Sequence, residues 1–321
     1  MALRPSELIG AAGRRYVFKQ LIQERPHLGR VWLATSGEDK FVLKDLPESY
    51  FSHFNENIRP KVPESSFLRL PHDTIPNQRI LVYKFMDDDF LHLVRKQISV
   101  QARKQILKAS LRGIAELHSH DIVHLDIKPN NIMINYRGTG TEAIVEQVQI
   151  IDFENASHIS DRMCIKGMLP GNDKWRSPEG HFRGKLSKPT DIFSFAVVCI
   201  YAMLGKVIFD VAEDYRKYES EGLLPYAFHL HRQVSFFGDR EGLDGLVRNV
   251  DGEEAKRALL ECFWTDRVAD YHPYRPFSEW PNVTDDEFKD LIRKMTSLDP
   301  KRRATAREAL EHPWFADCEI D

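Results

Sequence analysis

The feature that most constrains the fold is a change of sequence pattern near residues 84–90. Before this point, short runs rich in β-branched and aromatic residues predict strands, and Val31–Ala34 and Lys40–Lys44 flank a turn at Ser36–Asp39. After it, apolar residues recur every three to four positions over Val100–His118, a spacing typical of an amphipathic helix. This order predicts an α+β protein with two lobes, a small antiparallel β-rich lobe followed by a larger, mainly helical lobe.

The remaining elements follow from the same patterns. A short helix is expected over residues 48–58 and a strand over Arg79–Tyr83. Ile132–Asn135 and Val145–Ile151 predict a hairpin. Further helices are expected over residues 191–204, 241–249, 254–264, 285–297 and 305–314. The segment 206–240, rich in charged and aromatic residues, is interpreted either as a partner surface or as an insert packed on the helical lobe.

Composition narrows the class of protein. Lys and Arg number 45 against 48 Asp and Glu, a net charge of −3, which disfavours a nucleic-acid-binding protein. The longest apolar run, Phe193–Leu204, is shorter than the ~20 residues needed to cross a bilayer and predicts a buried helix. The 4 cysteines lie far apart, so neither a zinc site nor a disulfide framework is expected. We therefore expect an intracellular protein, cytoplasmic or nuclear, that binds neither nucleic acid nor membrane.

The string His124–Asn131 carries the most chemical information. It follows a predicted helix and precedes a predicted strand, and Asp126, Lys128 and Asn131 place a carboxylate base, a cation and a neutral metal ligand on one loop. Asp152 follows the next predicted strand, where a carboxylate can take a hard cation such as Mg²⁺. Taken singly, each of these groups has an ordinary alternative as a solvated polar residue of a loop.

Six motifs in this order give the chain a plain resemblance to the catalytic domain of eukaryotic protein kinases. They are Val42–Lys44, His124–Asn131, Asp152–Glu154, Ser177–Glu179, Asp191–Ala196 and Leu298–Thr305. Each motif is weak alone, but the ordered set is specific and covers most of the chain. The resemblance implies one kinase-like domain over residues 1–321, with an N-lobe of about 1–83, a hinge of about 84–89 and a C-lobe of about 90–321.

The resemblance implies an ATP- and Mg²⁺-dependent Ser/Thr protein kinase that transfers the γ-phosphoryl group to a hydroxyl of a protein substrate of unknown identity. By this resemblance Asp126 is the catalytic base and Lys128 neutralises the transferring phosphoryl group. Asn131 and Asp152 would hold Mg²⁺. The same motifs imply a buried structural ion pair, formed by Glu179 and Arg303.

The nucleotide-binding residues are also implied by the resemblance. Lys44 would hold the α- and β-phosphates and pair with a helix glutamate, either Glu56 or Glu64, of which Glu56 is favoured. Gly29 and Val31 fall in the phosphate-binding loop. In the hinge, the residue at the gatekeeper position is Tyr83, and the backbone facing adenine is that of Met86.

The sequence departs from the family pattern at several of these positions. Glu24 and Pro26 stand where the first two glycines of the phosphate-binding loop are expected, and Pro26 has no N–H to offer a phosphate. Glu154 replaces the glycine of the metal-binding triplet, and Leu125 replaces the arginine before the base. A pseudokinase that binds nucleotide or protein as a scaffold is therefore the alternative function, and a small-molecule kinase is a more distant one. We expect a monomer or a weak oligomer.

Overall fold

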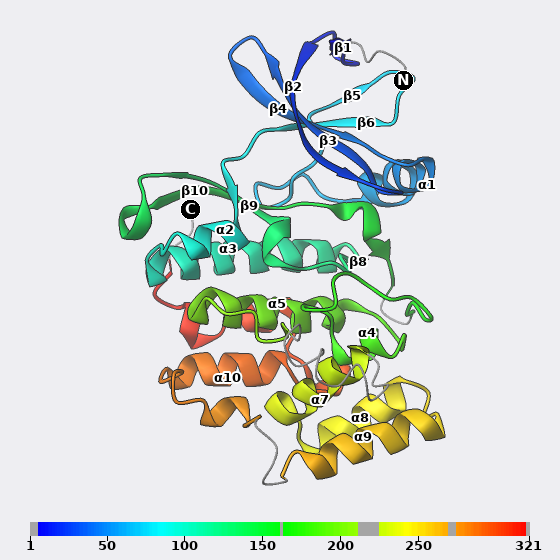
Figure 1. The fold of residues 1–321 in the computed structure, drawn as a ribbon, viewed down its shortest axis with the longest axis vertical. Helices are drawn as coiled ribbons and strands as arrows, with labels where there is room; N and C mark the ends of the chain where they lie inside the picture. The colour runs from blue at the N-terminus through cyan, green and yellow to red at the C-terminus, as the bar shows by residue number, and fades with distance from the viewer. Residues whose placement is uncertain (1–5, 161–162, 211–224, 269–273, 319–321) are drawn as a thin grey trace.

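A twisted sheet lies above a stack of helices in the computed structural model (Figure 1). The structure describes residues 6–160, 163–210, 225–268 and 274–318. The sheet and one short helix come from the first part of the chain, and the helices come from the later part. The α+β architecture with a β-rich N-lobe and a helical C-lobe, expected from the order of patterns, is confirmed.

The N-lobe sheet has six strands in the spatial order β1-β2-β3-β4-β6-β5, and each strand runs antiparallel to its neighbour. The strands are β1 (Glu7–Ile9), β2 (Arg15–Arg25), β3 (Gly29–Ser36), β4 (Asp39–Asp45), β5 (Asp73–Ile75) and β6 (Ile80–Lys84). The rings of Tyr16 and Phe41, both buried, meet edge to face with centroids 5.1 Å apart. This apolar face fixes the register of β4 and with it the position of Lys44.

The helix of the N-lobe is shorter than the sequence predicts. α1 spans Glu48–His53, and residues Phe54–Ile58 continue as a single π-helical turn. Phe54 and Ile58 are fully buried and anchor this turn to the core. The buried pair therefore sets which face of the turn points inward.

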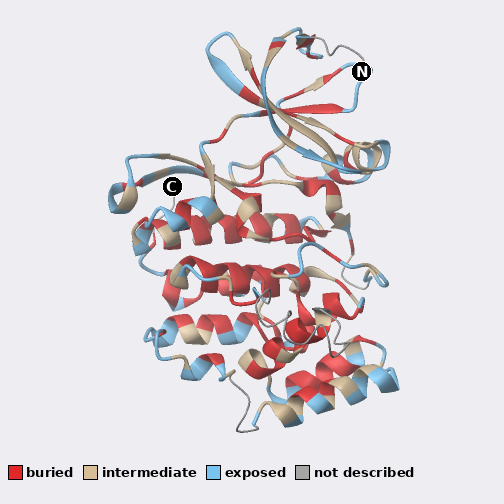
Figure 2. Cartoon of the chain, viewed as in Figure 1, coloured by how far each residue is buried: buried red, intermediate tan, exposed pale blue. Residues whose placement is uncertain are grey.

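Two long helices form the centre of the C-lobe. α3 (Val100–Ser119) begins where the Ser99 side chain accepts a hydrogen bond from the backbone N–H of Ala102. α5 (Lys188–Leu204) ends at Gly205, whose φ of 67° suits a left-handed cap. Figure 2 shows nearly continuous burial along α5, as expected for a helix packed on all sides, whereas α3 alternates between buried and more exposed residues.

The other helices surround this pair. They are α2 (Phe90–Arg95), α4 (Pro178–His181), α7 (Pro225–Phe237), α8 (Arg240–Asn249), α9 (Glu254–Asp266), α10 (Asp286–Met295) and α11 (Ala306–Leu310). The helix expected over 305–314 stops at Leu310, because Pro313 opens a separate 3₁₀ turn. Within the segment 206–240, α7 packs into the C-lobe through Phe237, which contacts Phe193 of α5. Tyr215 and Tyr218 of that segment lie outside the described residues.

Two small sheets, separate from the N-lobe sheet, carry the loops of the site. β7 (Asp88–Asp89), β9 (Ile132–Arg137) and β10 (Ile144–Ile150) form one sheet in the order β10-β9-β7. β8 (Ile122–Val123) pairs with β11 (Ser157–His158) in the other. The predicted hairpin is thus β9–β10. These pairings bring the loop after β8 and the loop after β10 to the same end of the C-lobe.

Candidate active site

The loop of Asp126 is held from below by the first turn of α5. Both oxygens of Asp191 accept backbone hydrogen bonds at 2.8 Å, Oδ2 from His124 and Oδ1 from Leu125. Leu125 has a φ of 64°, an uncommon left-handed conformation for a branched apolar residue. The buried carboxylate of Asp191 supports this conformation, so the direction of the next side chain is fixed by α5.

His124 acts as a brace within the same loop. Its Nδ1 accepts from the backbone N–H of Asp126 at 3.2 Å, so Nε2 carries the ring proton and donates to the carbonyl of Ile151 at 2.9 Å. The ring is completely buried and meets Phe153 edge to face. His124 therefore ties the loop of Asp126 to the segment that contains Asp152.

The three polar residues expected on this loop do come together. Oδ2 of Asp126 accepts from Nζ of Lys128 at 2.6 Å and from Nδ2 of Asn131 at 3.1 Å. Oδ1 of Asp126 is buried and has no hydrogen-bond partner among the described residues. Nδ2 of Asn131 also donates to the Asp126 carbonyl at 2.8 Å. The orientation of the amide is therefore fixed, and its Oδ1 remains as an acceptor or metal ligand. The loop thus presents one free carboxylate oxygen and one amide oxygen.

Gly171 closes over the free oxygen of Asp126. Its φ is 54°, and an added Cβ would lie 2.8 Å from Oδ1 of Asp126 and 2.8 Å from the carbonyl of Leu125. Arg176 holds this strip of chain by donating to the carbonyls of Pro170 at 2.7 Å and Gly171 at 2.8 Å. Sequence reasoning did not identify Gly171 or Arg176 as neighbours of Asp126, because only the fold brings the two loops together.

Asp152 lies just beyond β10 and faces Lys44 of β4. Asp152 has a left-handed φ of 74°, and its carboxylate accepts a hydrogen bond from Nζ of Lys44. The backbone N–H of Ile151 donates to the carbonyl of Asn131 at 3.0 Å, which places the Asp152 and Asn131 segments side by side. Burial opposes ionisation, but Lys44 holds the pKa of Asp152 well below its usual range.

The helix glutamate expected beside Lys44 is not there. Glu56 lies in the π-helical turn after α1 and is exposed, and Glu64 is exposed as well. Neither forms an ion pair with Lys44 in the described chain; Nζ of Lys44 instead lies 2.8 Å from Oε1 of Glu154. Burial opposes the charged form of Lys44, but Glu154 and Asp152 together raise the pKa of Lys44 above its ordinary value.

In the hairpin expected to bind phosphates, the backbone of β3 at Gly29 packs closely against the end of β4. Gly29 has a φ of 93°, and a Cβ there would lie 1.9 Å from the carbonyl of Asp45, so glycine is required for the approach of β3 to β4. Val31 pairs across the strands with Lys44. Arg25 and Gly29 are cross-strand partners at the end of β2 and β3, so Pro26 falls in the turn.

The hinge residues lie between the two lobes. Tyr83 of β6 is buried opposite Val42, and burial raises the pKa of its hydroxyl. Met86 is buried. Arg69, which sequence reasoning missed, stacks its guanidinium on the Tyr83 ring at 5.1 Å and donates to the carbonyl of Lys84. Since its backbone N–H also bonds Ile150, Arg69 links the hinge to β10.

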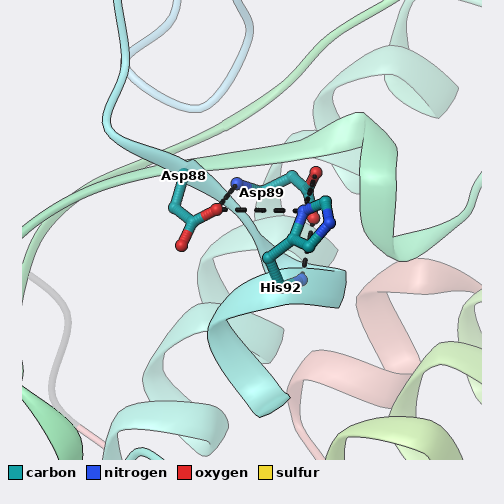
Figure 3. A group of neighbouring side chains, drawn as sticks. All are labelled: Asp88, Asp89 and His92. Atoms are coloured by element: carbon teal, nitrogen blue, oxygen red, sulfur yellow. Dashed lines mark hydrogen bonds and ion pairs between the residues drawn. The ribbon is translucent and has the colours of Figure 1, made fainter. Parts of the chain in front are cut away.

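An acidic cluster marks the start of α2. Figure 3 shows Asp88, Asp89 and His92, whose ligand atoms all lie within 4.8 Å of one another. Asp89 accepts from the backbone N–H of His92 at 2.9 Å and caps the helix. Asp88 forms an ion pair with Lys96 at 2.8 Å. Both carboxylates are thus committed to stabilising the first turns of α2.

The ion pair expected between Glu179 and Arg303 forms in the core of the C-lobe. Both side chains are fully buried, and Arg303 donates from two nitrogens to the two oxygens of Glu179 at 2.8 Å each. Thr190 of α5 donates to the same carboxylate at 3.1 Å. Burial opposes ionisation, but Arg303 holds the pKa of Glu179 below its usual range.

A pair of buried histidines lies on the other side of α4. His181 stacks on His229 of α7 with ring centroids 5.1 Å apart, and neither ring nitrogen of His181 makes a hydrogen bond within the described chain. Burial, followed by the charges of His229 and Arg176, lowers the pKa of His181 well below its usual value, against a weaker raising effect of Asp173. His181 is thus held neutral in the folded protein.

This neutrality makes stability depend on pH. Because the unfolded chain protonates His181 near pH 6.5 and the folded chain does not, its contribution is fully present above that pH. As the pH falls below 6.5, the free energy of unfolding is expected to fall by up to about 1.4 kcal/mol per pH unit. Urea unfolding between pH 5 and 7 measures this slope. His181→Phe keeps the ring and removes the proton site, so an unchanged slope in that variant would contradict the assignment.

Comparison with known proteins identifies the family. The family model described as the protein kinase domain matches residues 70–315. The chain therefore belongs to the protein kinase domain family. The match begins after β4, so the position of Lys44 is known from the structure and not from the family model.

Individual relatives agree with this family at low identity. The chain is 26% identical over 224 residues to the serine/threonine-protein kinase/endoribonuclease ire-1 of Caenorhabditis elegans, covering 69% of this chain and 18% of that protein. It is 27% identical over 270 residues to the proline-rich receptor-like protein kinase PERK2 of Arabidopsis thaliana, covering 80% and 35%. The chain spans less than two thirds of the length of the curated relatives it matches.

A solved crystal structure of a kinase domain superposes with a TM-score of 0.73 at 15% sequence identity, covering 98% of each chain. At that identity the similarity shows the fold. Within the described part of the chain, no helix combines the length and the apolar composition needed to cross a lipid bilayer.

Proposed function

We propose that this protein kinase is an ATP- and Mg²⁺-dependent serine/threonine kinase acting on a protein substrate. The observation that carries the proposal is the network around Asp126, in which Lys128 and Asn131 hold one carboxylate oxygen and leave the other free. Lys128, two positions after the base, is similar to Ser/Thr-type kinases. One domain over residues 1–321 with a hinge at about 84–89 is part of the same proposal.

In this mechanism the carboxylate of Asp126 orients the substrate hydroxyl and accepts its proton. The ammonium of Lys128 stabilises the negative charge of the transferring phosphoryl group. Lys44 binds the α- and β-phosphates, while Tyr83 and Met86 border the adenine site and Gly29 and Val31 the phosphates. Catalysis then consists mainly of positioning and charge stabilisation.

The donor set suits a hard divalent cation. The carboxylate of Asp152 and the amide Oδ1 of Asn131 are oxygen ligands of the kind Mg²⁺ prefers, and their segments lie side by side. When bound, Mg²⁺ supplies charge neutralisation to the nucleotide phosphates. The expected location, cytoplasmic or nuclear, agrees with free thiols at Cys164 and Cys262 on the surface.

Removal of the metal is expected to abolish transfer of phosphate from ATP. Wild-type protein is incubated with γ-labelled ATP and a peptide library with Ser and Thr acceptors, with either Mg²⁺ or excess EDTA. Labelled phosphoserine or phosphothreonine should form only with Mg²⁺, and Mg²⁺ added back should restore it.

The alternative hypothesis is a pseudokinase, and it is favoured by Pro26 and Glu154, which stand where the family pattern has glycine. A thermal-shift titration with Mg²⁺ and ADP separates the two functions, since a ligand that binds only the folded state raises the melting temperature. A shift without phosphate transfer would support a nucleotide-binding scaffold and contradict the kinase proposal. Transfer to a small hydroxyl compound but not to peptides would support the small-molecule alternative.

A further inference from the structure

The ammonium group of Lys44 is largely buried, so it requires an oppositely charged partner in the folded protein. Its side chain is 22% exposed and comes from β4, an inner strand of the N-lobe sheet, whereas Glu56 is exposed. An unpaired charge in such a position is costly, and the pairing must come from groups packed against β4. Asp152 and Glu154 are the carboxylates that form ion pairs with it among the described residues.

Glu154 is the more deeply buried of these two carboxylates. Its side chain is 4% exposed, against 27% for Asp152. No hydrogen bond of standard geometry reaches either oxygen of Glu154 in the part of the chain that the structure describes. Burial raises the pKa of Glu154 to about 8, an effect that the ammonium of Lys44, 2.8 Å from Oε1, opposes and the charge of Asp152 increases. Lys44 is therefore the cation that favours the charged form of Glu154. Without Lys44, the charged form of Glu154 would be buried and uncompensated, and without Glu154, Lys44 would keep only Asp152 as a partner among the described residues.

The short 3₁₀ turn Phe153–Asn155 holds Glu154 in this position. Phe153 packs against the ring of His124, and the backbone N–H of Ala156 closes the turn on the Phe153 carbonyl at 3.0 Å. His53 of α1 contacts the carbonyl of Ala156 at 2.8 Å. The segment after Asp152 is thus fixed from both lobes, and it presents Glu154 upward to β4.

We propose that Glu154 is the positioning residue of Lys44, replacing the glutamate that α1 does not supply. The inference rests on the proposed function, in which Lys44 binds phosphates and Asp152 holds the cation. With Asp152 engaged in that role, Glu154 is the carboxylate that stays with Lys44. The orientation of Lys44 is then set by the segment that follows β10, and the position of α1 need not govern it.

A double-mutant cycle on the nucleotide-free protein tests the ion pair directly. Lys44→Met, Glu154→Gln and the double variant are unfolded in urea, beside a control cycle of Lys44→Met with Glu56→Gln. The effects of Lys44→Met and Glu154→Gln are expected to be non-additive by roughly tenfold in the unfolding equilibrium constant. The Glu56 cycle should be additive within about twofold. Coupling to Glu56 and none to Glu154 would overturn the proposal.

Two further comparisons keep the test decisive. If one of the single variants folds poorly, the double variant should still be more stable than Lys44→Met alone, because it removes Glu154, a buried charge that Lys44→Met leaves without its ion-pair partner; equal instability of these two would count against the pair. Glu154→Asp should recover part of the coupling, since it restores the charge with a shorter reach.

The Mg²⁺ concentration required for ADP binding is a second measurement, and it should not change if Glu154 has only a structural role. In Glu154→Gln, Lys44 has only Asp152 to pair with, and this pairing competes with the cation. The Mg²⁺ concentration that gives half of the ADP-induced thermal shift should therefore rise severalfold, with partial recovery in Glu154→Asp. An unchanged requirement for Mg²⁺ would contradict positioning. If the wild-type protein transfers no phosphate but Lys44 and Glu154 are still coupled in the double-mutant cycle, the result would contradict the proposed function and leave the positioning role of Glu154 in place.

Discussion

Replacing Asp126 with asparagine is expected to lower kcat for phosphate transfer by roughly 10³-fold, the scale of a lost general base. Asparagine has nearly the same shape, and its side-chain oxygen can still accept from Lys128 and Asn131, as Oδ2 of Asp126 does at 2.6 and 3.1 Å. What it lacks is the negative charge and basicity of the carboxylate, which we propose accepts the proton of the substrate hydroxyl. The loss should therefore appear in the chemical step and not in the fold.

The measurement compares initial rates of peptide phosphorylation at saturating Mg²⁺ and ATP. The ADP-induced thermal shift of the Asp126→Asn variant should match that of wild type, because the substitution leaves Lys44 and Asp152 unchanged. Asp39→Asn, at the exposed start of β4, is the matched control and should retain the wild-type rate within about twofold. Rates in Asp126→Asn within tenfold of wild type would place the base elsewhere.

Replacing Arg303 with methionine is expected to lower the free energy of unfolding by about 3–5 kcal/mol. Methionine has a similar length and fills much of the space, so the main loss is the charge that compensates Glu179. Both partners of the pair are fully buried and joined by two hydrogen bonds of 2.8 Å, so removing Arg303 leaves the Glu179 carboxylate buried without a counter-charge.

Urea denaturation followed by circular dichroism measures this change. The double variant Glu179→Gln with Arg303→Met removes both charges and should be more stable than Arg303→Met alone. Arg302→Met is the control from the adjacent position, where the exposed ion pairs with Asp239 and Glu241 predict a loss of at most about 1 kcal/mol. A loss of less than 1 kcal/mol in Arg303→Met would show that this pair contributes no more than a surface ion pair.

Elements with a strong periodic pattern were predictable from sequence, and so were residues close together on one loop. α3 extends over Val100–Ser119, against an expectation of Val100–His118, because its apolar spacing is continuous and Ser99 marks its start. Asp126, Lys128 and Asn131 lie within six positions, so the local chain already brings them together. The short helices were less predictable, as α1 and α11 show, since their ends depend on packing and on Pro313.

The sequence by itself determined the family, the two-lobed fold, the loop of Asp126 and the partnership of Glu179 with Arg303. Only the tertiary structure decided which carboxylates face Lys44, because Glu154 and Lys44 come from different lobes and no local pattern records their distance. It likewise decided that Gly171 covers Asp126 and that Arg69 joins the hinge to β10. The physical reason is that spacing along the chain encodes local geometry, whereas the pairing of buried charges depends on which surfaces the folded core brings into contact.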